Sequence, residues 1–183
     1  YGAKVYFLRP KILAKDNSPE WLSWKHAVNF LEKKLKKFPK KIIVLPVTSP
    51  CRKVSDINKC IRLFDNRKID ISMVVTKSNH HPSFNLVKKR GNIIKLINSY
   101  RKISNRQEFV NTFKLTTVAI VTNSEIILKK KRIFDAKVGA IEIPNSRAID
   151  IDSIDDFSYC EYLFKKYKYD RFFKKKYNHY RSW

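Results

Sequence analysis

The fold is decided by the stretch KIIVLPVTSPCRKVSDINKCIRLFDNRKIDISMVVT, residues 41–76. Its continuous apolar run at 41–45 predicts a buried strand, and Pro46 and Pro50 then bracket a rigid loop at the carboxyl end of that strand. Ser55 is expected to cap a helix, and residues 69–76 read as a second strand. A strand–loop–helix–strand unit of this kind is a crossover, and ligands bind such sheets beyond the carboxyl ends of the strands.

The same alternation of helices and strands continues outside this stretch. Ser18 is the expected N-cap of a helix at 19–37, and Ser153 with Asp156 forms a capping box for a helix that starts near Ile154. Further expected elements are strands at 117–122 and 137–143 and a short helix at 124–130. This order predicts an α/β fold in which helices cover a sheet.

Composition limits the class of protein. The chain has 183 residues, of which 43% are hydrophobic, so it is apolar enough to fold and long enough for one domain. Its apolar runs are far shorter than the roughly 20 residues of a membrane span, so no membrane partner is expected. The three cysteines lack the spacing of metal ligands and fit reduced thiols, which favours a cytoplasmic protein.

The net charge of +24 suggests a second kind of function. Residues 165–183 mix cations with aromatic rings, a pattern that would suit a nucleic-acid or acidic-surface binding module. The same tail also reads as an amphipathic terminal helix or a segment docked on a neighbour. Because much of the surplus positive charge lies in Lys pairs and triplets at solvent-facing helix positions, we do not expect nucleic acid to be the main partner.

Asp150 and Asp152 form the sharpest site signal. If residues 147–152 are extended, the alternation places both carboxylates on one face. Two adjacent carboxylates repel unless a cation lies between them, and a hard divalent ion with oxygen ligands is the usual solution. The alternative is that one of these acids caps the helix that follows.

Two weaker signals accompany the aspartates. Thr48, Ser49 and Arg52 could hydrogen-bond a polyhydroxy or anionic ligand, although an ordinary turn would look the same. Arg106 and Gln107 supply planar donors that could hold a carboxylate.

Several segments, taken in order, resemble one family. They are Phe7-Leu8-Arg9-Pro10, Leu45-Pro46-Val47-Thr48-Ser49-Pro50, His81-Pro82-Ser83-Phe84-Asn85, Arg106-Gln107, Leu115-Thr116-Thr117-Val118-Ala119 and Ala148-Ile149-Asp150-Ile151-Asp152. Their order and spacing over about residues 1–163 resemble the acylneuraminate cytidylyltransferases, or CMP-sialic acid synthetases. The resemblance implies a Rossmann-like nucleotidyltransferase, a three-layer α/β sandwich with a mostly parallel sheet. It also implies a cytidylyltransferase domain at 1–164, an arm at about 77–113 that joins two copies into a homodimer, and a separate tail at 165–183.

The reaction implied by the resemblance joins CTP to a nonulosonic acid, giving a CMP-sugar and pyrophosphate with the help of Mg²⁺. By similarity Asp150 and Asp152 hold the ion, and Arg106 acts with them in catalysis. Arg9 and Ser18 correspond to positions near the nucleotide. Thr48, Ser49, Arg106 and Gln107 correspond to positions near the sugar and its carboxylate. The substrate could be sialic acid or a related acid such as legionaminic or pseudaminic acid.

The chain departs from the family pattern in two places. Several relatives carry Gln where this chain has Pro46. The family also begins with a strand and a basic, glycine-containing loop around the CTP phosphates, whereas the glycines here are Gly2, Gly91 and Gly139. We therefore expect an N-terminally truncated fold, and we expect these 183 residues to be inactive alone.

Overall fold

A computed structural model describes residues 3–66, 68–98 and 111–167 of the chain. The chain divides into two compact units. The first unit comprises Tyr1–Val44, Asn58–Met73 and Ile120–Ala140, and the second unit comprises Leu45–Ile57, Val74–Ala119 and Ile141–Trp183.

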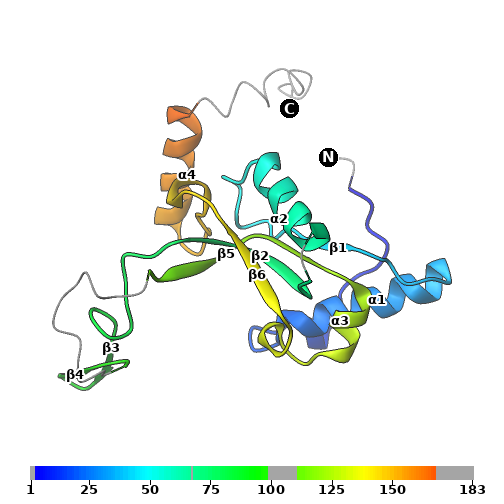
Figure 1. The fold of residues 1–183 in the computed structure, drawn as a ribbon, viewed down its shortest axis with the longest axis horizontal. Helices are drawn as coiled ribbons and strands as arrows, with labels where there is room; N and C mark the ends of the chain where they lie inside the picture. The colour runs from blue at the N-terminus through cyan, green and yellow to red at the C-terminus, as the bar shows by residue number, and fades with distance from the viewer. Residues whose placement is uncertain (1–2, 67, 99–110, 168–183) are drawn as a thin grey trace. The chain divides into compact units, whose positions relative to one another are not determined.

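The described elements include both helices and strands (Figure 1). In chain order they are η1 (Lys11–Ala14), α1 (Glu20–Leu35), β1 (Ile42–Val44), α2 (Val54–Asn66), β2 (Ile71–Lys77), β3 (Val87–Arg90), β4 (Ile93–Leu96), β5 (Phe113–Thr122), α3 (Ser124–Lys129), η3 (Ile133–Asp135), β6 (Val138–Glu142), η4 (Asn145–Arg147) and α4 (Ile154–Lys166). Four strands form one sheet in the order β1-β5-β2-β6, and β3 and β4 form a separate hairpin. The predicted mixed α/β fold, compatible with a Rossmann-like arrangement, is confirmed.

The sheet is mixed in direction. β1 pairs antiparallel with β5, with Ile42 opposite Thr122 and Val44 opposite Ile120. Hydrogen bonds at the ends of β5 and β2, from Ser78 N to Thr112 O and from Thr122 Oγ1 to Asp70 O, show that these two strands are also antiparallel. Those at the ends of β6 and β2, from Asp70 N to Lys137 O and from Ile143 N to Val75 O, show that these two strands are parallel. β1, β2 and β6 therefore share a direction, and β5 opposes them.

Three local expectations are wrong, and the segment whose extension was a condition of the alternation argument is not assigned as a strand. β1 is not buried, because it lies at an edge of the sheet and leaves Ile43 39% exposed. The N-cap of α1 is Pro19 rather than Ser18, because the helix begins at Glu20. Ser55 lies inside α2, and Asp56 accepts the hydrogen bond of the Lys53 amide instead. The backbone at 148–152 is irregular rather than a strand.

The first unit is organised around an apolar core. Its buried members come from α1, β2, β5 and α3: Trp21, Trp24, Val28, Ile71, Met73, Ile120 and Ile127. α1 and α3 pack together (Figure 1), and the Trp21 indole N–H donates to the Lys130 carbonyl over 2.9 Å. The helix predicted at 19–37 is therefore present as α1, with Trp21, Trp24 and Val28 buried in this core.

The second unit has a smaller apolar cluster formed by Cys51 of the loop after β1 and by Cys160 and Leu163 of α4. The capping box predicted for α4 is confirmed, because Ser153 and Asp156 each bond the backbone amide of the other. The arm at 77–113 contains the β3–β4 hairpin, which turns at Gly91 with a positive φ of 59°.

Parts of two predicted regions are not covered by the structure. Residues 99–110 of the arm and 168–183 of the tail lie outside the described residues, so the domain boundaries stay predictions. Of the helices that the structure describes, none has both the length and the apolar character needed to cross a membrane.

Candidate functional site

The loop after β1 is held against β5 by polar contacts within the second unit. Ser49 is fully buried, and its hydroxyl hydrogen-bonds the Thr117 hydroxyl of β5. Arg52 donates from Nε to the Ser49 carbonyl over 2.6 Å and from Nη1 to the Val118 carbonyl over 2.8 Å. Because these bonds fix both the loop backbone and its anchor on β5, the loop is positioned before any ligand arrives.

The segment that carries Asp150 lies beside this loop. The Ile151 amide donates to the Thr48 carbonyl over 2.8 Å. Five residues before Asp150 in the same segment, the Asn145 side-chain oxygen accepts a hydrogen bond from the hydroxyl of Thr76, near the end of β2, over 2.9 Å. The structure therefore brings Thr48, Ser49 and Asp150 together beyond the carboxyl ends of β1 and β2, where the crossover pattern predicted a site.

Asp150 has an unusual environment for a carboxylate. Its Oδ1 atom is buried and has no hydrogen-bond partner among the described residues. Arg52 is close enough to interact: burial lowers the pKa of its guanidinium, and the negative charge of Asp150 acts in the opposite direction. A buried acceptor without a partner is costly, and a bound cation or donor would remove that cost.

Neither predicted metal ligand, Asp150 or Asp152, caps α4 with its side chain. Ser153 is the N-cap, and Asp156 is the acid that completes the box. Asp156 also accepts from the Asp152 amide over 3.2 Å, and hydrogen bonds, first of all from Ser153, lower the pKa of Asp156. The alternative role for Asp150 or Asp152, capping the helix, therefore falls to Asp156 instead.

Asp150 and Asp152 are the two carboxylates in this region that could contribute to a magnesium site. Within residues 3–66, 68–98 and 111–167, no group of three or more His, Cys, Asp and Glu side chains could hold a metal. Mg²⁺ does not require such a group, since it commonly binds one or two carboxylates together with phosphate oxygens and water. Asp150, with its unpartnered oxygen, and Asp152, which is exposed, could supply those carboxylates.

The remaining predicted residues are not joined to this cluster by the structure. Arg9 and Ser18 belong to the first unit, where Arg9 is exposed and the Ser18 amide donates to the Lys15 carbonyl. Arg106 and Gln107 lie outside the described residues. Their roles at the nucleotide and the sugar stay predictions.

Sequence reasoning missed an ion pair beside the cluster. Arg147 binds Asp56 in a two-pronged contact, from Nε to Oδ2 over 2.9 Å and from Nη2 to Oδ1 over 3.0 Å. The two residues are 91 positions apart, so no local spacing could have signalled the pair.

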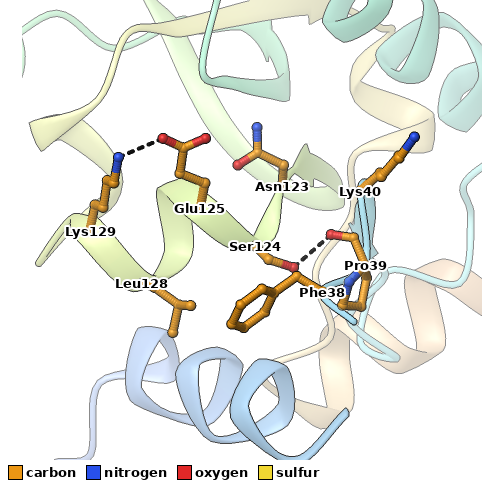
Figure 2. Close-up of a pocket in the computed structure, with 8 residues that line it drawn as sticks. All are labelled: Phe38, Pro39, Lys40, Asn123, Ser124, Glu125, Leu128 and Lys129. Carbon is orange, nitrogen blue, oxygen red and sulfur yellow. Dashed lines mark hydrogen bonds and ion pairs between the residues drawn. The ribbon is translucent and has the colours of Figure 1, made fainter. Parts of the chain in front are cut away.

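A pocket in the first unit offers a contrast (Figure 2). It has a volume of about 450 Å³ and contains none of the predicted site residues: its lining is Phe38, Pro39, Lys40, Asn123, Ser124, Glu125, Leu128 and Lys129. Several of its polar groups bond one another, since Ser124 donates to the Pro39 carbonyl and Lys129 pairs with Glu125. The site in the second unit is therefore the better candidate.

No family model matches the chain, and the known proteins described next are similar to it at low identity. It is 25% identical over 167 residues to the post-translational flagellin modification protein B of Campylobacter coli, covering 91% of this chain and 70% of that protein. It is 26% identical over 164 residues to the CMP-N,N'-diacetyllegionaminic acid synthase of Campylobacter jejuni, covering 89% of this chain and 69% of the relative. An N-acylneuraminate cytidylyltransferase of Streptococcus agalactiae serotype V is 25% identical over 116 residues, which are 63% of this chain and 28% of the streptococcal protein. The resemblance seen in the sequence motifs is thereby confirmed: this chain is similar, at low identity, to proteins named N-acylneuraminate cytidylyltransferase and CMP-N,N'-diacetyllegionaminic acid synthase.

Proposed function

We propose that this chain provides the metal- and sugar-binding part of a cytidylyltransferase. In the reaction the anomeric oxygen of a nonulosonic acid forms a bond to the α-phosphorus of CTP. The bond between the α- and β-phosphates breaks, pyrophosphate leaves, and the hydroxyl proton is released. The observation that carries this proposal is the buried, unpartnered oxygen of Asp150 beside Arg52 and the Thr48–Ser49 loop, in a chain whose relatives have cytidylyltransferase names.

The aspartates and the loop of the cluster have different tasks in this proposal. Asp150 and Asp152 would hold Mg²⁺, which supplies neutralisation of the phosphate charge. Ser49, buried and bonded to Thr117, positions the loop, while Thr48 lies on the same loop with a half-buried side chain. Orientation of the two reactants by such a rigid loop lowers the entropy cost of bringing them together.

Residues beyond the cluster complete the proposal. Arg106 and Gln107 would bind the sugar carboxylate, because the planar guanidinium matches carboxylate geometry. Arg9 and Ser18 would contact the nucleotide.

The proposal includes a homodimer formed through the arm. The β3–β4 hairpin exposes apolar side chains, Val87, Ile93, Ile94 and Leu96 among them. A hairpin of two strands is marginally stable alone, so a second copy that covers these side chains would stabilise it.

Calorimetry with Mg²⁺ and CTP tests the metal assignment. It should be run on the chain and on a version extended upstream by a glycine-containing phosphate loop. We expect CTP binding and turnover only in the extended version. We expect Asp150→Asn to lower kcat/KM by at least about 100-fold, because a lost metal ligand removes several kcal/mol of charge stabilisation.

Asp155→Asn is the matched control, since it removes the same charge from an exposed position in the first turn of α4. We expect this variant to retain activity close to that of the parent. Equal losses in the two variants, or CTP binding by neither version of the chain, would refute the assignment. A salt-sensitive affinity for oligonucleotides in place of CTP binding would instead support the basic-module alternative.

Measuring pyrophosphate release with a panel of sugar acids would identify the substrate. We expect turnover with at least one of sialic, legionaminic and pseudaminic acid. Rejection of all three by an extended version that binds CTP would remove the sugar-acid part of the proposal.

A further inference from the structure

We propose that the ion pair between Asp56 and Arg147 positions the Asp150 carboxylate for its cation. This inference rests on the proposed function, because Asp150 is the proposed metal ligand. Asp56 and Arg147 are positioning residues that act through the backbone segment carrying Asp150.

The geometry of the pair is well defined. The Asp56 side chain is fully buried and the Arg147 side chain is 20% exposed. Both Asp56 oxygens accept from the guanidinium, and Oδ2 also accepts from the Lys53 amide over 3.0 Å. Because a guanidinium bound at two points has little rotational freedom, the pair fixes both the position and the tilt of Arg147.

Arg147 stands where it can control the segment that follows. It is the last residue of η4, three positions before Asp150. The segment is held to the carboxyl end of β2 by Asn145, which accepts from Thr76, and to the loop after β1 by Ile151, which donates to Thr48. The contact of Arg147 with Asp56 adds a tie to the start of α2, so Asp150 lies between two fixed points.

Energetics favour a geometric role for the pair. A buried ion pair adds little net stability compared with apolar residues of the same size, since two charges lose their hydration. It does impose one arrangement on the groups it joins. Two nitrogens of the Arg147 guanidinium bond Asp56, while the Oδ1 atom of Asp150 stays without a hydrogen-bond partner among the described residues.

The test is a Mn²⁺ titration of the ¹⁵N-labelled 183-residue chain, read from the broadening of backbone amide signals. Mn²⁺ serves as a paramagnetic substitute for Mg²⁺. We expect signals at 149–153 to broaden first in the wild-type chain, and Asp150→Asn to abolish that selectivity. Melting temperature is measured on every variant.

The decisive variant is the double substitution Asp56→Asn with Arg147→Gln, which keeps the shape of Asp56, replaces the Arg147 guanidinium with a shorter neutral amide, and removes both charges. We expect its melting temperature to stay near that of the wild type. We expect the Mn²⁺ concentration that broadens 149–153 to rise about ten-fold or more, the usual effect of removing a group that orients a metal ligand. Arg147→Lys, which keeps the charge but loses the fork, should give a smaller increase, and it serves if the double variant does not fold.

The matched control neutralises an exposed pair in α4, Glu161→Gln with Lys165→Gln, whose charged atoms are 3.4 Å apart. We expect it to leave the titration unchanged. Unchanged broadening at 149–153 in the folded double variant, or in Arg147→Lys, overturns the positioning role. If the wild-type chain shows no selective broadening there, the metal assignment is refuted, and the inference is refuted with it. That result differs from selective broadening in the wild type that is unchanged in the pair variants, which refutes the positioning role alone.

Discussion

Different interactions stabilise the interior of the first unit and the site region of the second unit. In the first unit, side chains such as Trp24, Val28 and Ile71 form one apolar core. In the site region, a small cluster around Cys51 and Cys160 is accompanied by hydrogen bonds and a buried ion pair. Apolar burial is non-directional and grows with area, whereas each polar contact requires one partner at one angle. The first region should therefore carry more of the stability, and the second should be more sensitive to single polar changes.

The largest effect is expected in the apolar core. Trp24→Ala should lower the free energy of unfolding by about 3–5 kcal/mol, since Trp24 is 8% exposed and its ring lies 5.2 Å from that of Trp21. Urea unfolding followed by circular dichroism measures the loss. Leu22→Ala is the control in the same helix, where Leu22 is 43% exposed and a much smaller loss is expected. Similar losses in both variants would contradict the core assignment.

The three cysteines report on the two regions separately. Burial, together with a hydrogen bond to Cys160, raises the pKa of the Cys51 thiol from 9.0 to about 12. The thiolate fraction at pH 8, and with it the alkylation rate, should therefore be about a thousand-fold lower in the folded chain than in the unfolded chain. Because the folded pKa is raised, the associated stability is complete below about pH 9 and declines as the pH rises through the folded pKa. Alkylation followed by mass spectrometry measures each thiol.

Across a urea series, we expect Cys51 and Cys160 to become reactive at lower concentrations than Cys60 of the first unit. The smaller apolar cluster around Cys51 and Cys160 is the reason. Simultaneous exposure of all three thiols would show that the two regions unfold as one.

A single polar contact in the site region should have a moderate effect. Ser49→Ala leaves the Thr117 hydroxyl without its partner and should reduce the free energy of unfolding by about 1–2 kcal/mol. Adding Thr117→Val should recover part of the loss, because both polar groups are then removed. Urea unfolding measures the three variants, and Ser158→Ala on the exposed side of α4 is the control. A double variant with a lower free energy of unfolding than Ser49→Ala would argue against the hydrogen bond between Ser49 and Thr117.

The smallest effect concerns the cap of α4. Hydrogen bonds from Ser153 lower the pKa of Asp156, so its contribution is present above the ordinary value of 3.8 and is lost as the pH falls through the lowered pKa. Ser153→Ala should raise the pKa of Asp156 toward 3.8 and cost about 1 kcal/mol of stability. Carboxyl ¹³C titration measures the pKa. An unchanged value would contradict the capping box.

Local patterns predicted the elements better than their environments. The helix predicted at 19–37 is present as α1, and the Ser153–Asp156 capping box was confirmed. The apolar run at 41–45 predicted a strand correctly but its burial wrongly, because a sheet edge depends on which strands pair and not on the run itself.

The candidate site shows the same division. Asp150 stood out from its spacing with Asp152, but the alternation argument assumed an extended segment, and the backbone there is irregular. The unpartnered oxygen of Asp150 and the contact between Arg147 and Asp56 became visible only in three dimensions.

The amino-acid sequence by itself determined the α/β class, the approximate boundaries of most elements and the resemblance to the acylneuraminate cytidylyltransferases, because these depend on neighbours in the chain. The tertiary structure decided that β5 lies between β1 and β2, that Ser49 is anchored by Thr117 and that Asp56 holds Arg147. These contacts join residues far apart in sequence. They arise only when the folded chain brings matching donors and acceptors within hydrogen-bond distance, so the local periodicity of the sequence cannot predict them.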